Sequence, residues 1–226
     1  MNVTVHSLHW DNVNPKIVEA QKKVLDHLDI PMNYTKMNAP HGAWMDHVCK
    51  NVKSDVLVFF DADCVPLDRK IFDESVAYAV ENNTFVGIAQ ASNHIPPCSH
   101  IFAAPAFFAI TKSCYEQLGM PSFSENSRSD VAEEVSYVAE AKGKRYRCLY
   151  PTRFDGIPLE GVWRLSNYGF FGIGTLFADK IYHLYQGRFN KNVELFCRRC
   201  DQIVEGKFDM SGMHDSLSEF RGNVVV

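Results

Sequence analysis

The chain has 226 residues, 46% of them hydrophobic, and a formal net charge of −4, so it can bury one substantial core and lacks the basic balance of a nucleic-acid-binding protein. No apolar run reaches the roughly 20 residues that a membrane span needs, and the first residues lack the basic and apolar regions of a secretion signal. The seven cysteines show no framework spacing, which favours reduced thiols in a cytoplasmic protein.

Hydrophobic periodicity predicts alternating strands and helices over the first part of the chain. Asn14 and Pro15 are a suitable N-cap and first helical position, and Pro31 marks the end of that helix. The elements expected up to residue 60 are a strand at 3–8, a helix from 15, a weaker strand at 30–37, a helix at about 43–52 and a strand at 56–60. This order is typical of an α/β fold with a doubly wound, mostly parallel central sheet flanked by helices, Rossmann-like, in a single domain.

The strand predicted at Val56–Phe60 is a continuous apolar run, which is typical of a strand buried on both faces. It ends in two carboxylates, Asp61 and Asp63, and Pro66 stops its continuation. In open α/β sheets, ligands bind beyond the carboxyl ends of the strands, where these acids fall. Two carboxylates so close repel each other unless a cation or a shared proton relieves them. The plain alternative is an Asp-rich turn.

Further strands and helices follow this stretch. They are expected as a helix at 72–81, strands at 84–91 and 106–110, a helix at 112–118 closed by Gly119, a helix from about 130 to 142 closed by Gly143, and a strand at 145–150. The loop at 92–104 carries His94, Cys98 and His100 beside two prolines, and we favour a rigid loop or a substrate contact over a metal site. Asp130, Glu133 and Glu134 are explained without a catalytic role, as acids in the first turn of a helix.

The last third of the sequence is less regular. Residues 154–175 are rich in glycine and aromatic residues without strand or helix period, which predicts a mobile or substrate-lining loop. His183 lies in a short apolar run, where a lone histidine is more often a core residue than a ligand. An amphipathic helix is expected at 189–204, and we interpret its Cys197 and Cys200 as structural because no second pair completes a zinc site. The tail beyond Gly206 has no assigned structure.

Several of these features, taken together and in order, resemble the GT-A-fold nucleotide-sugar glycosyltransferases, especially those of family 2. Asp61-Ala62-Asp63 is similar to the DxD motif of that family, and Asp46 lies fifteen residues before Asp61, the family's interval. The family's glycine is matched by Gly42. Residues 106–110 followed by Leu118-Gly119 are similar to the strand and turn before the catalytic acid, and Asp130 falls at the start of the next helix.

The resemblance covers residues 1 to about 190 and has departures. Asp46 stands where the family usually has Asn, and Ser129 stands where Glu usually precedes the Asp. The helix up to Gly143 is also a residue or two too long. The last two departures leave Glu133 or Glu134 open as the base in place of Asp130.

The resemblance implies a metal-dependent, inverting transfer of a sugar from a nucleoside diphosphate sugar, most commonly a UDP-sugar, to a glycan or other hydroxyl acceptor. Asp63, His183 and Asp61 would bind Mn²⁺ or Mg²⁺, and Asp130 would act as general base. The residues implied in nucleotide-sugar binding are Leu8, His9, Asp11, Gly42, Asp46, Asp61, Ala62 and Asp63. The residues suggested for the acceptor are His94, His100 and Trp163.

The same resemblance suggests how the chain is divided. A glycosyltransferase domain would span residues 1–205, with a nucleotide-sugar-binding half at 1–100 and a catalytic, acceptor-binding half at 101–190. Residues 206–226 would form a C-terminal appendage. The sequence leaves the oligomeric state open.

Two other readings remain. An apolar strand ending in Asp61-Ala62-Asp63-Cys64-Val65 also meets the first motif of haloacid dehalogenase-type phosphatases, with Asp61 as nucleophile. That motif normally lies early in the chain, and no later acidic pair follows a strand here to hold magnesium. A non-catalytic nucleotide-sugar-binding module that has lost the base is the third possibility.

Overall fold

The computed structural model describes residues 1–92, 94–95, 99–218 and 224–225. Pro96, Pro97 and Cys98 of the predicted loop lie outside the described residues, as do residues 219–223 and 226 of the tail. Among the helices that are described, none is long and apolar enough to cross a membrane. The described cysteines are free thiols.

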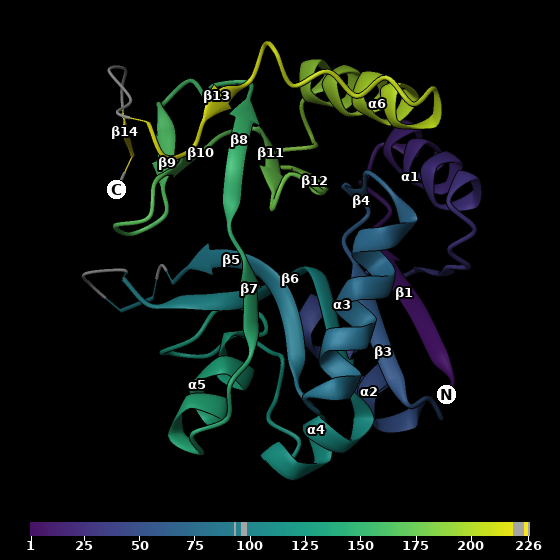
Figure 1. Ribbon diagram of the computed structural model, residues 1–226, viewed down its shortest axis with the longest axis vertical. Helices are drawn as coiled ribbons and strands as arrows, with labels where there is room; N and C mark the ends of the chain where they lie inside the picture. The colour runs from purple at the N-terminus through teal and green to yellow at the C-terminus, as the bar shows by residue number, and fades with distance from the viewer. Residues whose placement is uncertain (93, 96–98, 219–223, 226) are drawn as a thin grey trace.

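The central sheet lies in the lower half of Figure 1. Its strands, in spatial order, are β2 (Asn33–Lys36), β1 (Val3–His9), β3 (Val56–Phe60), β6 (Ile101–Thr111), β5 (Phe85–Ala91) and β7 (Arg147–Leu149). β6 runs antiparallel to both of its neighbours, and the other strand pairs are parallel. Every residue of β3 is buried, as its continuous apolar sequence predicts. The prediction of an α/β fold with a mostly parallel central sheet is confirmed.

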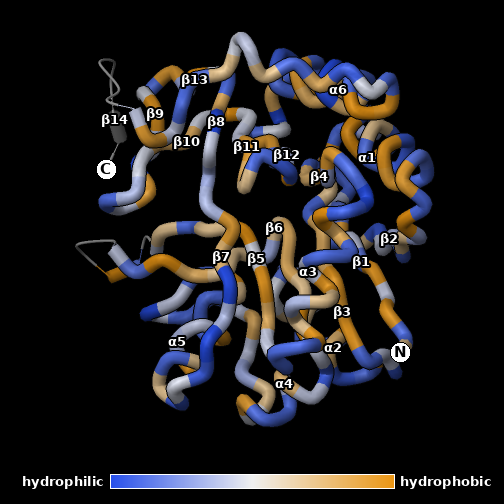
Figure 2. Tube along the Cα trace, viewed as in Figure 1, coloured by the Kyte–Doolittle hydropathy of each residue, from blue (hydrophilic) through white to orange (hydrophobic). Residues whose placement is uncertain are grey.

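Helices cover both faces of this sheet because successive side chains of a strand point to opposite sides. Leu57 and Phe59 of β3 pack with the helices of one face, which are α2 (His41–Asn51), α4 (Lys112–Leu118) and α5 (Glu133–Ala141). Val56, Val58 and Phe60 pack on the other face with α3 (Arg69–Glu81) and with Leu25 of α1 (Pro15–His27). The hydropathy colouring shows these central strands as largely apolar (Figure 2).

A second, antiparallel sheet lies above the first in Figure 1. Its strands are β13 (His214–Asp215), β8 (Pro151–Asp155), β11 (Gly174–Phe177), β12 (Ile181–Leu184) and β4 (Cys64–Pro66). α6 (Asn190–Val204) and α1 share an apolar cluster with this sheet. Tyr150 alone separates β7 from β8, so the chain passes directly from one sheet to the other. β4 begins directly after Asp63, so the short segment that contains both acids connects β3 of the first sheet to β4 of the second.

The prediction of a loop without strands at 154–175 is wrong. β9 (Val162–Arg164) pairs with β10 (Phe170–Phe171), and β14 (Val224–Val225) lies parallel to β9. The flanking parts of the segment belong to β8 and β11. Strands of two to five residues are too short for a two-residue period to stand out.

The predicted start of the helix near residue 130 is also wrong, since α5 begins at Glu133. Ala132, directly before it, has a left-handed backbone with φ of 69°. Asp130 therefore lies in a turn, where its Oδ1 accepts a hydrogen bond from the Val131 amide at 2.7 Å. The helix predicted at 112–118 is confirmed residue for residue, and Gly119 closes it with φ of 88°.

Candidate active site

A cavity of about 330 Å³ opens beyond the carboxyl ends of β1 and β3. Its wall is shared by residues in or just after strands of the first sheet, by the loop after β1, by the start of α2, and by β12 with the segment after it. The lining residues are Leu8, Trp10, Val13, His41, Asp61, Ala62, Asp63, Gln90, Pro105, Ala106, His183, Leu184, Tyr185 and Gln186. The predicted carboxylate pair therefore lies in a ligand-sized hollow at the edge of the sheet where α/β folds bind ligands.

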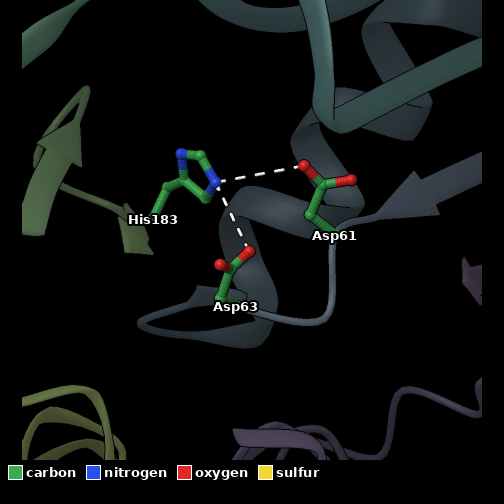
Figure 3. A group of neighbouring side chains, drawn as sticks. All are labelled: Asp61, Asp63 and His183. Carbon is green, nitrogen blue, oxygen red and sulfur yellow. Dashed lines mark ion pairs between the residues drawn. The ribbon is translucent and has the colours of Figure 1, made fainter. Parts of the chain in front are cut away.

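Asp61, Asp63 and His183 converge in this cavity from two elements (Figure 3). Nε2 of His183 lies 3.5 Å from Oδ1 of Asp63 and 4.0 Å from Oδ2 of Asp61. One ligand atom from each of the three residues lies within 4.8 Å of the others. In the part of the chain that the structure describes, this is the one group of at least three His, Cys, Asp or Glu side chains with such spacing.

Backbone pairing explains how residues 120 positions apart meet. β12 pairs antiparallel with β4 so that His183 lies opposite Cys64, the residue after Asp63. The Leu184 amide also donates to the carbonyl of Asp63 at 2.9 Å. Gln21 of α1, which is buried, donates from Nε2 to the carbonyl of Asp61 at 2.6 Å and to that of Cys64 at 2.8 Å.

The electrostatics of the site favour a cation. Burial raises the pKa of Asp61, and the Asp63 carboxylate raises it further, while His41 and His183 oppose the shift. Two carboxylates and an imidazole are a donor set suited to Mn²⁺ or Mg²⁺ rather than to a structural zinc. A divalent ion would relieve the repulsion between the acids, so these residues fit such an ion. Nδ1 of His183 is buried and has no hydrogen-bond partner among the described residues.

One aromatic side chain, Tyr185, lines the cavity on the side of the second sheet. Tyr185 lies edge-on to His183, with ring centroids 4.3 Å apart, and its other ring neighbours are Phe171 at 5.3 Å and Trp163 at 5.4 Å. Burial raises the pKa of the Tyr185 hydroxyl far above its usual range. Trp163, suggested for the acceptor, therefore packs against the Tyr185 ring and does not itself line the cavity.

The candidate bases differ in their surroundings. Gln90, which lines the cavity, donates from Nε2 to Oδ2 of Asp130 at 3.3 Å. Burial raises the pKa of Asp130. Glu134 instead forms an ion pair with Arg128, whose hydrogen bonds lower the pKa of that carboxyl. An acid held ionised by an arginine is a weak proton acceptor, so Asp130 is the better candidate of the two.

Glu133 has a different role because its side chain is fully buried. Its Oε2 accepts hydrogen bonds from the Asp130 amide at 2.8 Å and from Ser92 Oγ at 3.1 Å. Its Oε1 lies 2.6 Å from Nδ1 of His100, whose Nε2 lies 3.1 Å from Glu140. Through these contacts Glu133 stabilises the turn that contains Asp130.

The two histidines suggested for the acceptor do not line the cavity. His100 stacks on Tyr137 with ring centroids 4.0 Å apart and is engaged by two carboxylates. His94 lies close enough to Asp130 to oppose, in part, the rise in the pKa of that acid that burial causes.

Of the residues suggested for nucleotide-sugar binding, Leu8, Asp61, Ala62 and Asp63 line the cavity, whereas His9, Asp11, Gly42 and Asp46 do not. Asp11 borders a shallower neighbouring hollow, where Asn38 donates to it at 2.7 Å and Lys36 lies 3.3 Å away. Trp10 lines both hollows.

Gly42 and Asp46 instead attach α2 to the segment 122–124. A Cβ on Gly42 would lie 2.6 Å from the carbonyl carbon of Phe123, so only glycine permits this approach. Asp46 accepts hydrogen bonds from Ser122 Oγ at 2.6 Å and from the Phe123 amide at 3.1 Å.

Several residues that line the cavity were not foreseen from the sequence. They are His41, Gln90, Tyr185 and Gln186. His41 follows Pro40 at the first position of α2, a signal that was available, since residues at a helix N-terminus after a βα turn often face the ligand edge of a sheet. Gln90 and Tyr185 carried no comparable pattern.

No family model matches the chain, and no curated protein matches it. Among solved structures, it is similar to the mannosyltransferase PcManGT from Pyrobaculum calidifontis in complex with GDP-Man and Mn²⁺, with a TM-score of 0.48, 11% identity, and 65% of this chain and 54% of that chain covered. It thus spans about half of that enzyme's length. A197 from STIV has a TM-score of 0.45 at 13% identity, with 82% of this chain and 95% of that chain covered.

A Drosophila β1,4-galactosyltransferase 7 mutant in complex with manganese, UDP-Gal and xylobiose has a TM-score of 0.45 at 9% identity, with 65% of each chain covered. TM-scores below 0.5 mark a distant likeness of shape.

Proposed function

We propose that this protein is a metal-dependent glycosyltransferase that moves a sugar from a nucleoside diphosphate sugar to an acceptor hydroxyl. The observation that carries the proposal is the convergence of Asp61, Asp63 and His183 in one cavity beyond the parallel strands. A divalent ion held by these residues would attract an anionic substrate, and a cavity of about 330 Å³ suits a small molecule rather than a macromolecular partner. A UDP-sugar is the donor we test first.

Asp63, His183 and Asp61 would hold Mn²⁺ or Mg²⁺, which stabilises the negative charge that develops on a departing diphosphate. The protein's own contribution is to aim these side chains. Gln21 and the pairing of β4 with β12 fix the backbone on both sides of the pair of acids. Leu8 and Trp10, on the same wall, would contact the nucleoside.

Asp130 would accept the proton of the acceptor hydroxyl as that oxygen attacks the anomeric carbon and the nucleoside diphosphate leaves from the opposite face, so the configuration at that carbon inverts. Such general-base catalysis contributes about 10²–10⁴-fold to the rate. Gln90 connects Asp130 with the cavity, and the raised pKa of Asp130 brings it closer to the value that suits a base near neutral pH. Glu133 would position Asp130 through its backbone amide. Tyr185, supported by Trp163, would offer an aromatic face to the acceptor.

Calorimetric titration of UDP into the protein, first with Mn²⁺ and then with EDTA, tests the proposal. We expect binding that requires the metal and that is lost in Asp63→Asn. A parallel titration with GDP shows whether the site prefers uracil or guanine as the nucleobase. If neither nucleotide binds under either condition, the proposal fails, and a phosphate-ester hydrolysis assay becomes the next experiment.

A further inference from the structure

The cavity holds a second imidazole that lies outside the metal-ligand group. Nε2 of His41 lies 3.5 Å from Oδ1 of Asp61, while Oδ2 of the same carboxylate faces His183. Asp61 therefore lies between two histidines, one on each of its oxygens. His41 is not within ligand spacing of the three-residue group.

We propose that His41 is a positioning residue, which holds Oδ1 of Asp61 so that Oδ2 stays turned toward the metal; this inference rests on the proposed metal site. Partners that orient a metal ligand through its other atom are a general feature of metal centres. The backbone of Asp61 is already held, because its amide donates to Ala106 at 2.9 Å and its carbonyl accepts from Gln21. In the described structure, His41 is the group that faces the remaining side-chain oxygen.

The fold keeps His41 in place. His41 is the first residue of α2, and its ring packs against Trp44 with ring centroids 5.9 Å apart. Trp44 in turn lies edge-on to Phe59 of β3, with ring centroids 5.6 Å apart. Gly42 and Asp46 anchor the same turns of α2 to the segment 122–124. The Gly and Asp that the sequence singled out thus act on the site indirectly, by setting the position of the helix that carries His41.

Helix stability offers no competing reason for this residue. The N-terminal turn of a helix favours acidic residues and disfavours positive charge, so a histidine gains nothing there from the helix dipole. Its side chain is 17% exposed, which places the ring in the wall of the cavity rather than in solvent.

The test compares Mn²⁺ affinity, measured from the electron paramagnetic resonance signal of free Mn²⁺, in the wild-type protein and three variants. His41→Ala should weaken binding about 10–100-fold, the usual cost of losing an orienting partner. His41→Gln keeps an N–H donor on a side chain of similar reach and should restore most of the affinity. His47→Ala is the matched control, because His47 is exposed on the same helix and its side chain contacts Asn51.

Nitrogen couplings to the bound Mn²⁺ separate a positioning role from direct ligation. We expect a coupling that is lost in His183→Ala and kept in His41→Gln. A coupling that disappears with His41 would make it a ligand and overturn the inference. So would a His41→Ala protein that is folded, by its metal-free melting temperature, and binds Mn²⁺ as tightly as wild type. If the wild-type protein itself fails to bind Mn²⁺, the proposed function fails as well, so the two failures are distinct.

Discussion

Replacing Asp63 by Asn tests whether Asp61 and Asp63 form a cation-binding site. The ligand atoms of Asp61, Asp63 and His183 lie within 4.8 Å of one another. Two full negative charges at that separation repel by about 3.5 kcal/mol at an effective dielectric constant of about 20. This repulsion is present in the metal-free wild-type protein. Asp63→Asn removes the repulsion but also weakens the contact between Asp63 and His183. The metal-free variant should therefore melt no lower than the metal-free wild type.

With Mn²⁺ present, the wild-type protein should have the higher melting temperature of the two. An ion at 100 times its dissociation constant stabilises the folded state by about 2.7 kcal/mol. For a chain of this length, that corresponds to a rise in melting temperature of about 5–10 °C. Asp63→Asn loses one of two charged ligands and should show almost none of this rise at the same Mn²⁺ concentration.

Differential scanning fluorimetry across a Mn²⁺ series, with EDTA as the zero point, measures both effects. Asp11→Asn serves as the control, because Asp11 is an exposed acid outside the cavity. A variant at position 63 that keeps the full Mn²⁺-dependent rise would refute the reasoning. A metal-free variant that melts well below wild type would show instead that the carboxylate is needed for folding.

Three further predictions concern other residues. A base must be ionised, and burial raises the pKa of Asp130, so the transfer rate should fall on acidification at a pH above the ordinary pKa of an aspartate. Asp130→Asn should lower transfer by about 10²–10⁴-fold while leaving Mn²⁺ binding intact. Gly42→Ala should cost about 1–3 kcal/mol in urea denaturation because its Cβ would overlap Phe123, whereas Gly212→Ala, where a Cβ meets open space, should be neutral. Arg199→Met should cost about 3–5 kcal/mol, since it leaves Asp155 buried without its cation; a loss below about 1 kcal/mol would contradict this account.

Much of the central sheet could be read from the sequence because its signals are local. Val56–Phe60 is apolar at every position and is buried at every position. The helices at 112–118 and 190–204 have strong local signals as well, a glycine C-cap in the first and an amphipathic period in the second. The turn that carries Asp130 was misjudged because good capping residues precede α5, yet the left-handed Ala132 delays the helix.

The second sheet could not be read in the same way. Its strands are short, and apart from the hairpin of β11 with β12 they pair with segments far away in the chain, so no local period reveals them. Part of the tail beyond Gly206 joins this sheet through β13, which pairs with β8. The site residues that depend on this sheet were accordingly the hardest to foresee, Tyr185 among them.

By itself, the sequence determined the apolar strand that ends in Asp61 and Asp63, because burial of a continuous apolar run and repulsion between neighbouring acids are properties of adjacent residues. The local pattern around His183, in contrast, favoured a core residue, and only a family resemblance suggested that His183 binds the metal. Tertiary structure alone decided that His183 and His41 lie on opposite oxygens of Asp61, since the first depends on the register of β12 with β4 and the second on the packing of α2. Both are long-range contacts, and no short stretch of sequence encodes them.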